Sequence, residues 1–233
     1  MNTICKFADI DIYLLYYLDI KTILKLLLLS IQQNTLMKNL EFIKQLRIIV
    51  RKHCSNNIID TAARYNYISL MQWLSESINE FKYSSNAIDK AAVNGHIIIL
   101  EWFANSKYKF KYTRHAIDFA ADNGHIKILD WFANSKYEFK YTERAIDYAA
   151  GRGHINILEW FANSKYEFKY SEYAIFFALR KHRLNILKWF DESKYKIKYA
   201  DYLIKQVLRR DCTDIYNYLG TDSRIIKIMG MHK

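Results

Sequence analysis

Tryptophan recurs in this chain at a fixed interval, and this interval constrains the fold more than any other feature. Five tryptophans follow one another at steps of 29 residues: Trp73, Trp102, Trp131, Trp160 and Trp189. The surrounding sequence repeats with them, since residues 116–139 and 145–168 are nearly the same text. Self-similarity at such a period is typical of a solenoid, in which each unit buries its apolar face against its neighbours. We therefore predict an all-α solenoid of stacked helix-turn-helix units with an N-terminal helical cap.

The period divides the chain into three predicted parts. Residues 1–54 do not follow it and form the N-terminal helical segment, residues 55–220 form the repeats, and residues 221–233 form a C-terminal tail. The predicted units are 57–85, 86–114, 115–143, 144–172, 173–201 and a partial unit 202–220.

Each unit is expected to hold two helices. Thr142 is suited to cap a first helix, and Ala149 and Ala150 would let that helix approach its copy in the next unit closely. A second helix follows from about Ile155 to Phe161. It is apolar over more than one face, so we expect it to be covered on two sides, with Trp160 in the core.

One position between the two helices predicts a left-handed backbone. Glycine adopts this conformation freely, and Asn, Asp and His are the other residues enriched there. In successive units the position is occupied by Asn66, Gly95, Gly124, Gly153, His182 and Asp211. We therefore expect a helix stop of the same geometry in every unit.

The end of each unit alternates between aromatic and charged residues. Residues 165–170 read KYEFKY, with related copies at 107–112, 136–141 and 194–199. A period of two predicts an extended arm with its aromatic face inward and its charged face outward.

The segment 145–161 resembles the core of the ankyrin repeat. Ile146, the alanine pair 149–150 and the Gly-His pair 153–154 stand at the family's Leu, Ala-Ala and Gly-His, and the match recurs in the two preceding units. The resemblance implies stacked ankyrin-like hairpins that bind proteins. Asp147 stands where the family has a capping His. The unit is shorter than the family's usual ~33 residues, and the missing residues fall in its β-hairpin finger, so we expect a shortened finger or a plain loop.

Such a short unit in a chain biased towards residues with A/T-rich codons resembles most closely the ankyrin-like proteins of giant viruses that infect amoebae. This resemblance implies a viral protein of the mimivirus-like type in the host cytoplasm, with host or viral proteins as partners.

Residues 7–45 resemble an F-box, a helical module that docks on the adaptor of a ubiquitin-ligase complex. The resemblance rests on the order of Leu14–Leu15, Tyr17–Asp19 and Lys21–Leu26. It implies that a ubiquitin-ligase adaptor is a partner. The alternative interpretation is a helical cap that seals the first repeat.

The cysteines and the N-terminus indicate an intracellular protein. Cys5, Cys54 and Cys212 are odd in number, far apart and outside any C-x-x-C spacing, which favours free thiols over disulfides or zinc. The first residues lack the pattern of a secretory signal, and no apolar run is long enough to span a membrane.

The formal charge of +11 raises the question of nucleic-acid binding. The excess lies mainly in residues 1–54 and 173–233, so the repeats lack the continuous basic stripe that tracks phosphates. Glu138 and Glu167 also interrupt the lysines of the arms. We therefore favour a protein partner over a nucleic-acid partner.

The residues capable of chemistry recur as parts of the repeat. His96, His125 and His154 take the same place in successive units, about 10 Å apart, so they cannot share a metal ion; a structural role after the turn is expected. No nucleophile motif, metal motif or phosphate loop is present. We predict no enzymatic activity, no cofactor and no metal.

These observations predict a monomeric scaffold for protein-protein interaction, whose binding surface is formed by the first helices and the arms. The predicted contacts are charged or polar positions, expected to be exposed, that vary between otherwise matching units: Lys90, Lys109, Arg114, His115, Asp122, Glu143, Arg144 and Arg152.

Overall fold

The computed structural model describes residue 22 and residues 58–77 and 81–198. Apart from residue 22, which is helical, the predicted cap at 1–54 lies outside the described residues, as do the partial unit 202–220 and the tail 221–233. The chain forms two compact units. The first comprises Met1–Ala91 and Ile98–Tyr112, and the second comprises Ala92–Ile97 and Thr113–Lys233.

All regular structure in the described residues is helical. Of the described helices, four lie in or mainly in the first unit: α3 (Ile58–Arg64), α4 (Ile68–Ser77), α5 (Asn86–Val93) and α6 (Ile97–Asn105). The described part of the second unit contains six helices: α7 (His115–Asp122), α8 (Ile126–Asn134), α9 (Arg144–Arg152), α10 (Ile155–Asn163), α11 (Glu172–Arg180) and α12 (Leu184–Glu192).

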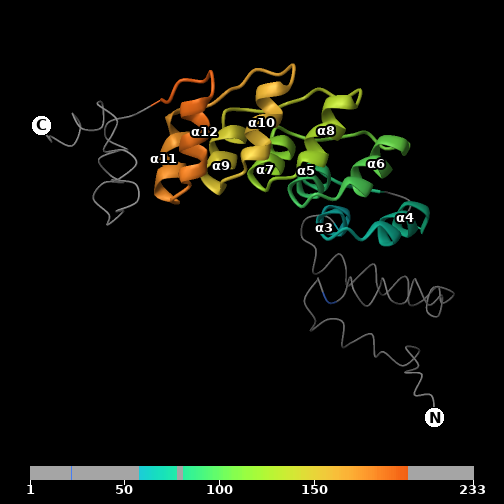
Figure 1. Ribbon diagram of the computed structural model, residues 1–233. Helices are drawn as coiled ribbons and strands as arrows, with labels where there is room; N and C mark the ends of the chain where they lie inside the picture. The colour runs from blue at the N-terminus through green and yellow to red at the C-terminus, as the bar shows by residue number, and fades with distance from the viewer. Residues whose placement is uncertain (1–21, 23–57, 78–80, 199–233) are drawn as a thin grey trace, which may run out of the picture. The chain divides into compact units, whose positions relative to one another are not determined.

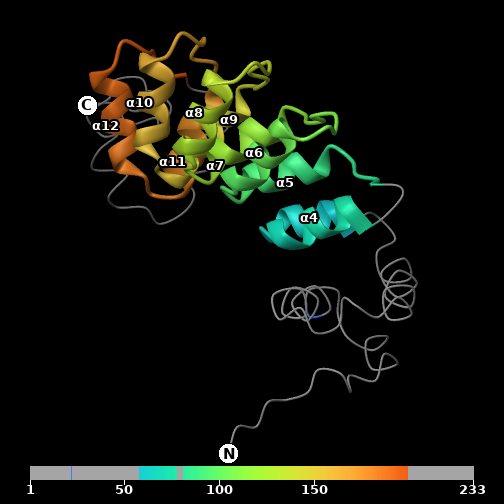
Figure 2. The same cartoon turned by 90° about the vertical axis from the view of Figure 1, so that its right-hand side faces the viewer.

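In the described part of the second unit, α7 to α12 form three helical hairpins stacked side by side in two layers (Figures 1 and 2). The first helices α7, α9 and α11 form one layer, in which α9 packs against both neighbours. The second helices α8, α10 and α12 form the other layer, and α10 contacts both α8 and α12. The predicted fold class, an all-α repeat solenoid, is confirmed.

The first helices, not the second, are the most deeply buried part of each hairpin. In α9 the alanines and Ile146 are fully buried, whereas α10 buries Ile157, Leu158 and Phe161 and exposes Glu159. Because α10 packs against α8, α9 and α12, the second helix is covered on more than one side as expected, but its outer face, with Glu159, is exposed. Because alanine is small, neighbouring first helices can approach each other closely and bury both faces. A count of large apolar residues does not predict this burial.

The tryptophans are only half buried, in contrast to the core position expected for them. Trp160 donates from Nε1 to Oδ1 of Asp130 at 2.6 Å, across the boundary between hairpins. The neighbouring Phe161 takes the core position and is 1% exposed. In this pair, Trp160 therefore contacts the neighbouring hairpin near the surface, and Phe161 packs in the core.

The left-handed turn is confirmed at every described position. The φ angles are 60° at Asn66, 74° at Gly95, 75° at Gly124, 86° at Gly153 and 56° at His182. The backbone N–H of His154 donates to the Ala149 carbonyl and that of Gly153 donates to the Ala150 carbonyl. This pair of bonds satisfies the last carbonyls of α9, as in a Schellman motif. Asp211 lies outside the described residues.

His125 and His154 each pack on the turn glycine of the preceding hairpin. A Cβ at Gly124 would lie 3.0 Å from the His154 ring, and a Cβ at Gly95 would lie 3.0 Å from the ring of His125. Glycine is therefore required here for two reasons: it adopts the left-handed backbone, and it leaves room for the histidine of the next hairpin. This placement agrees with the expected structural role.

A buried aspartate ties each of three first helices to the start of the next unit. Asp118, fully buried, accepts from the Thr142 N–H at 2.7 Å and from its hydroxyl at 2.8 Å. Asp147 accepts from the N–H of Ser171 at 2.9 Å and from its hydroxyl at 2.6 Å. Asp60 and Ser84 form the same pair in the first unit. We call this contact the aspartate clamp.

Thr142, the hydroxyl partner in the clamp of Asp118, also caps the helix that follows it. The Thr142 hydroxyl oxygen accepts from the N–H of Arg144 at 3.3 Å, so the expected capping by Thr142 is present. The regular helix nevertheless begins one residue later than expected, because Glu143 occupies the formal cap position in α conformation without a side-chain bond.

The arms are loops without strands in the described residues, which agrees with the predicted plain loop. Their aromatic residues face inward: Phe139 is 9% exposed and stacks on Tyr166 of the next arm with ring centroids 4.0 Å apart. The Tyr141 hydroxyl donates to the Glu167 carbonyl at 2.6 Å, and burial raises the pKa of Tyr141 to about 12. The arms thus form a third line of contact between hairpins.

We expect Asp118→Ala to lower the free energy of unfolding by about 1–3 kcal/mol, because it leaves the Thr142 N–H without its acceptor. Asp118→Asn retains an acceptor and should cost less. Glu159→Ala, on the exposed face of α10, should change stability by less than about 0.5 kcal/mol. Urea unfolding of the four proteins measures these values, and equal stability of Asp118→Ala and Glu159→Ala would contradict the role of the clamp.

The clamp should also make stability depend on pH. Burial raises the pKa of Asp147 from 3.8 to about 6, although its bonds with Ser171 act in the opposite direction. The folded state therefore binds more protons than the unfolded state between these two values, and the Asp147 contribution to stability should fall as pH rises through that window. The difference in urea unfolding free energy between wild type and Asp147→Asn should shift against wild type over this range. A difference that stays constant or moves the other way would contradict the assignment.

Candidate functional site

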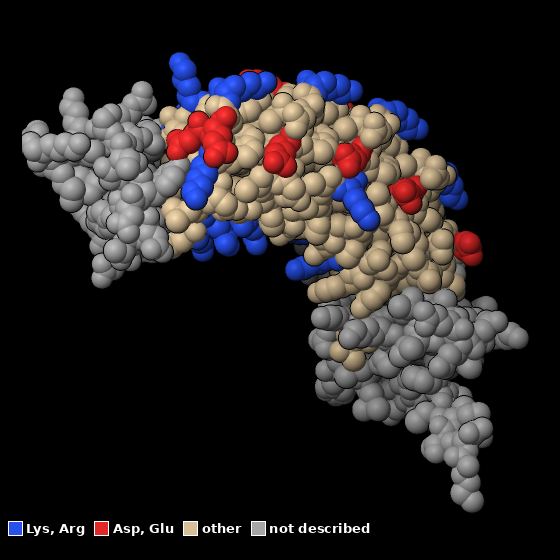
Figure 3. All heavy atoms as spheres, in the orientation of Figure 1, with Lys and Arg blue, Asp and Glu red and all other residues tan. Residues whose placement is uncertain are grey.

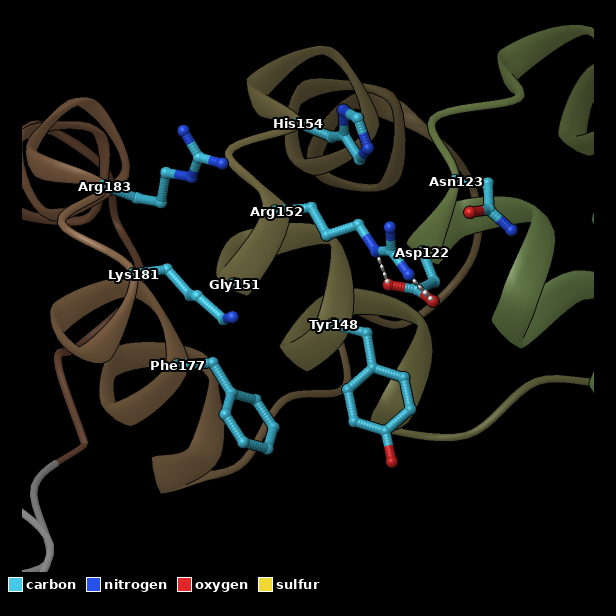
Figure 4. A pocket seen from close by; sticks show the side chains of 9 residues that line it. All are labelled: Asp122, Asn123, Tyr148, Gly151, Arg152, His154, Phe177, Lys181 and Arg183. Atoms are coloured by element: carbon cyan, nitrogen blue, oxygen red, sulfur yellow. Dashed lines mark hydrogen bonds and ion pairs between the residues drawn. The ribbon is translucent and has the colours of Figure 1, made fainter.

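The described part of the second unit contains an open pocket of about 760 Å³ on the side of the first helices and the turns that follow them (Figure 4). Residues from three successive hairpins line it. They are Asp122, Asn123, Tyr148, Gly151, Arg152, His154, Phe177, Lys181 and Arg183. Because each hairpin contributes side chains, only the stacked assembly forms this site.

One side of the pocket is aromatic. Tyr148 and Phe177 lie beside each other with ring centroids 5.7 Å apart, and Phe119 continues the row at 6.2 Å from Tyr148. All three rings are half buried. Phe119, Tyr148 and Phe177 occupy the same place in successive hairpins, directly after the position of the clamp aspartate, and we call them the aromatic row.

Gly151 determines how closely α11 approaches α9 at this point. A Cβ at Gly151 would lie 2.6 Å from the Phe177 Cβ, which is closer than real side chains come. The absence of a side chain at Gly151 therefore allows Phe177 to rest against the α9 backbone. The pocket floor depends on this contact.

The other side of the pocket is charged. Arg152 donates to both carboxylate oxygens of Asp122, from Nε at 2.6 Å and from Nη2 at 3.1 Å. Within the described residues, Lys181 and Arg183 form no ion pair, and both are exposed. Burial lowers the pKa of His154, and the nearby Arg152 lowers it further, which favours a neutral ring at pH 7. With His154 neutral, the lining carries three cations against one carboxylate.

This arrangement is suited to binding. The described lining contains no serine, threonine or cysteine that could act as a nucleophile, and its carboxylate is engaged by Arg152. No group of three or more potential metal ligands occurs in the described residues. The pocket offers an aromatic surface next to two cations that no described residue pairs with.

The structure brings together two of the eight predicted contact residues, Asp122 and Arg152, in a single ion pair. The Asp122 side chain is only 13% exposed, less than expected, and it pairs with Arg152; its role as a contact stays a prediction. The other six side chains are exposed. Two lie in the first unit (Lys90 and Lys109), and four lie at the starts of α7 and α9 (Arg114, His115, Glu143 and Arg144).

Sequence reasoning missed the aromatic row and the two cations of the pocket, Lys181 and Arg183, that have no ion-pair partner among the described residues. One available signal was the residue after each clamp aspartate, which is Phe119 in one unit and Tyr148 in the next. A second signal was Arg183, which stands where two preceding units have His125 and His154. Both positions vary in the way that the predicted contacts do.

The arms present a separate, basic edge. Figure 3 shows basic side chains gathered along the loops that follow α8 and α10, with acidic side chains over the second helices. Part of this charge is used within the fold: Nζ of Lys169 lies 4.9 Å from the Tyr141 ring centroid, and Lys198 lies 3.9 Å from that of Tyr170. Glu138 and Glu167 pair with Lys140 and Lys169.

None of the described helices has the length and the apolar character that crossing a membrane requires.

Part of the chain is similar to a known family of repeats. Residues 117–162 match the family described as ankyrin repeats (many copies). This stretch covers α7 to α10 apart from the first two residues of α7 and the last of α10, and so includes the clamp of Asp118 and the ion pair of Asp122 with Arg152. Among curated proteins, none matches the chain.

We predict that Gly151→Ala destabilises the protein although alanine favours helices by up to about 1 kcal/mol over glycine. The added methyl group cannot be accommodated next to the Phe177 Cβ unless α9 and α11 separate, and such overpacking costs about 1–3 kcal/mol. Arg180→Ala, at the same place in the next hairpin, should change stability by less than about 0.5 kcal/mol. Thermal unfolding distinguishes the two variants, and a stabilised Gly151→Ala protein would contradict the close packing.

Proposed function

We propose that this chain is a non-enzymatic scaffold that binds a protein partner through the surface formed by its first helices and the turns that follow them. The observation that carries the proposal is the aromatic row beside Lys181 and Arg183, two cations that form no ion pair with the residues the structure describes. Aromatic residues and arginine are enriched at protein interfaces and supply much of their binding energy. The match to ankyrin repeats supports the same general role.

The repeated frame makes such a surface effective. The backbone at the pocket is held by clamps, turns and stacked arms, so a partner would not have to order it on binding, and little affinity would be lost to that cost. The exposed residues Arg114, His115, Glu143 and Arg144 extend the proposed surface along the starts of α7 and α9. Lys90 and Lys109 remain proposed contacts in the first unit.

We extend the proposal to an intracellular, monomeric protein of the giant-virus type that binds host or viral proteins. The support for this extension is the 29-residue unit and the three widely spaced cysteines.

Residues 7–45, which resemble an F-box, carry a second candidate function. In that case the protein is a substrate adaptor, in which the N-terminal segment binds a ubiquitin-ligase adaptor and the repeats select the target. The full chain should then retain that adaptor from amoebal lysate, whereas a chain beginning at Ser55 should not. Equal retention of the same proteins by both chains would make residues 1–54 a cap.

Site-specific photo-crosslinking tests the proposed surface. A photoreactive phenylalanine analogue at Tyr148 of the full chain should form covalent adducts with a partner protein in amoebal lysate, because the proposed interface covers this ring. The same analogue at Lys188, on the exposed side of α12, serves as the control and should give none. Adducts from Lys188 alone, or from neither position, would refute the proposed surface.

A further inference from the structure

The pocket formed by α7, α9 and α11 has unequal sides, and this asymmetry restricts the chemistry of an occupant. Tyr148 and Phe177 offer an apolar surface, while Lys181 and Arg183 project from the turn after α11 (Figure 4). An occupant that gains from both sides must carry an apolar group and negative charge close together.

The cations of the pocket differ in how they are used. Arg152 is held by Asp122 through two hydrogen bonds, so its charge is largely compensated. Lys181 and Arg183 form no ion pair within the described residues. The two charges that no described residue compensates therefore lie on the hairpin of α11 and α12, at one end of the aromatic row.

The preceding hairpins do not reproduce this arrangement. The position of Lys181 is Arg152 in one hairpin and Asn123 in the hairpin before it, and the position of Arg183 is His154 and then His125. Asn123 is itself bonded to the backbone carbonyls of Val93 and Phe119. The excess positive charge is thus a local property of this pocket.

From these contacts we propose that the pocket binds an acidic peptide segment of the partner protein, in which an aromatic or large aliphatic side chain lies between carboxylates. The apolar side chain packs on Tyr148 and Phe177, and the carboxylates pair with Lys181 and Arg183. Charge complementarity of this kind guides association and excludes basic partners. The inference rests on the proposed scaffold function and specifies the chemistry of its partner.

Selection from a displayed library of random short peptides tests the inference on the full chain. The enriched peptides should be acidic and should contain an aromatic or large aliphatic residue. A synthetic copy of an enriched peptide should bind Lys181→Glu/Arg183→Glu at least about tenfold more weakly than wild type, because two attractive charges become repulsive. Its binding to wild type should also weaken as salt is raised.

The matched control is Lys127→Glu/Lys188→Glu, which changes the net charge equally at exposed positions on α8 and α12. It should bind the peptide as wild type does, and circular dichroism should show the same helix content in all three proteins. Replacement of the peptide's apolar residue by serine should also abolish most of the binding.

Three outcomes would overturn the inference: enriched peptides that are neutral or basic, equal loss of binding in both double variants, or no enriched peptide at all. In each case the scaffold function would still be tested by the crosslinking experiment at Tyr148, because that experiment does not depend on the partner's charge. Adducts there without an acidic preference would reject the inference and retain the scaffold.

Discussion

A buried carboxylate determines where one unit of this protein ends and the next begins. Asp118 and Asp147 each accept two hydrogen bonds from the Thr or Ser found 24 residues later, at the start of the following first helix. The intervening second helix and arm must therefore return the chain to a fixed point. The alanine-rich first helices also pack closely, so a short loop is long enough to connect one hairpin to the next. The described arms accordingly contain no β-hairpin finger.

This fixed frame separates stability from recognition. Clamps, left-handed turns and stacked aromatic rings recur with little change, whereas the residues around the pocket differ from hairpin to hairpin. Gly151 shows how one residue shapes the surface. Because it has no side chain, Phe177 can pack against the α9 backbone, and the aromatic row reaches the edge of the pocket. Arg152 shows the opposite case, because this varying residue forms an ion pair with Asp122 in the lining of the pocket.

Features set by local sequence were predictable, and features set by stacking were not. The left-handed turns followed from residue type alone, because few residues other than Gly153 and its polar equivalents accept that backbone. The inward aromatic face of the arms followed from alternation. The clamp was missed because Asp118 and Thr142 meet only in the stacked structure. The pocket was missed for the same reason, since Lys181 joins Tyr148 only when successive hairpins pack.

Native-state hydrogen exchange at the amides of Thr142 and Ser171 tests the central claim most directly. Both amides lie outside regular helices, and their partners are the buried carboxylates Asp118 and Asp147. If the clamp sets the frame, these amides should exchange as slowly as the helical amides of Ile117 and Ile146, because they open only when the hairpins separate. Exchange as fast as that of the exposed arm residue Lys165 would contradict the account, since the repeats would then be held without the clamp.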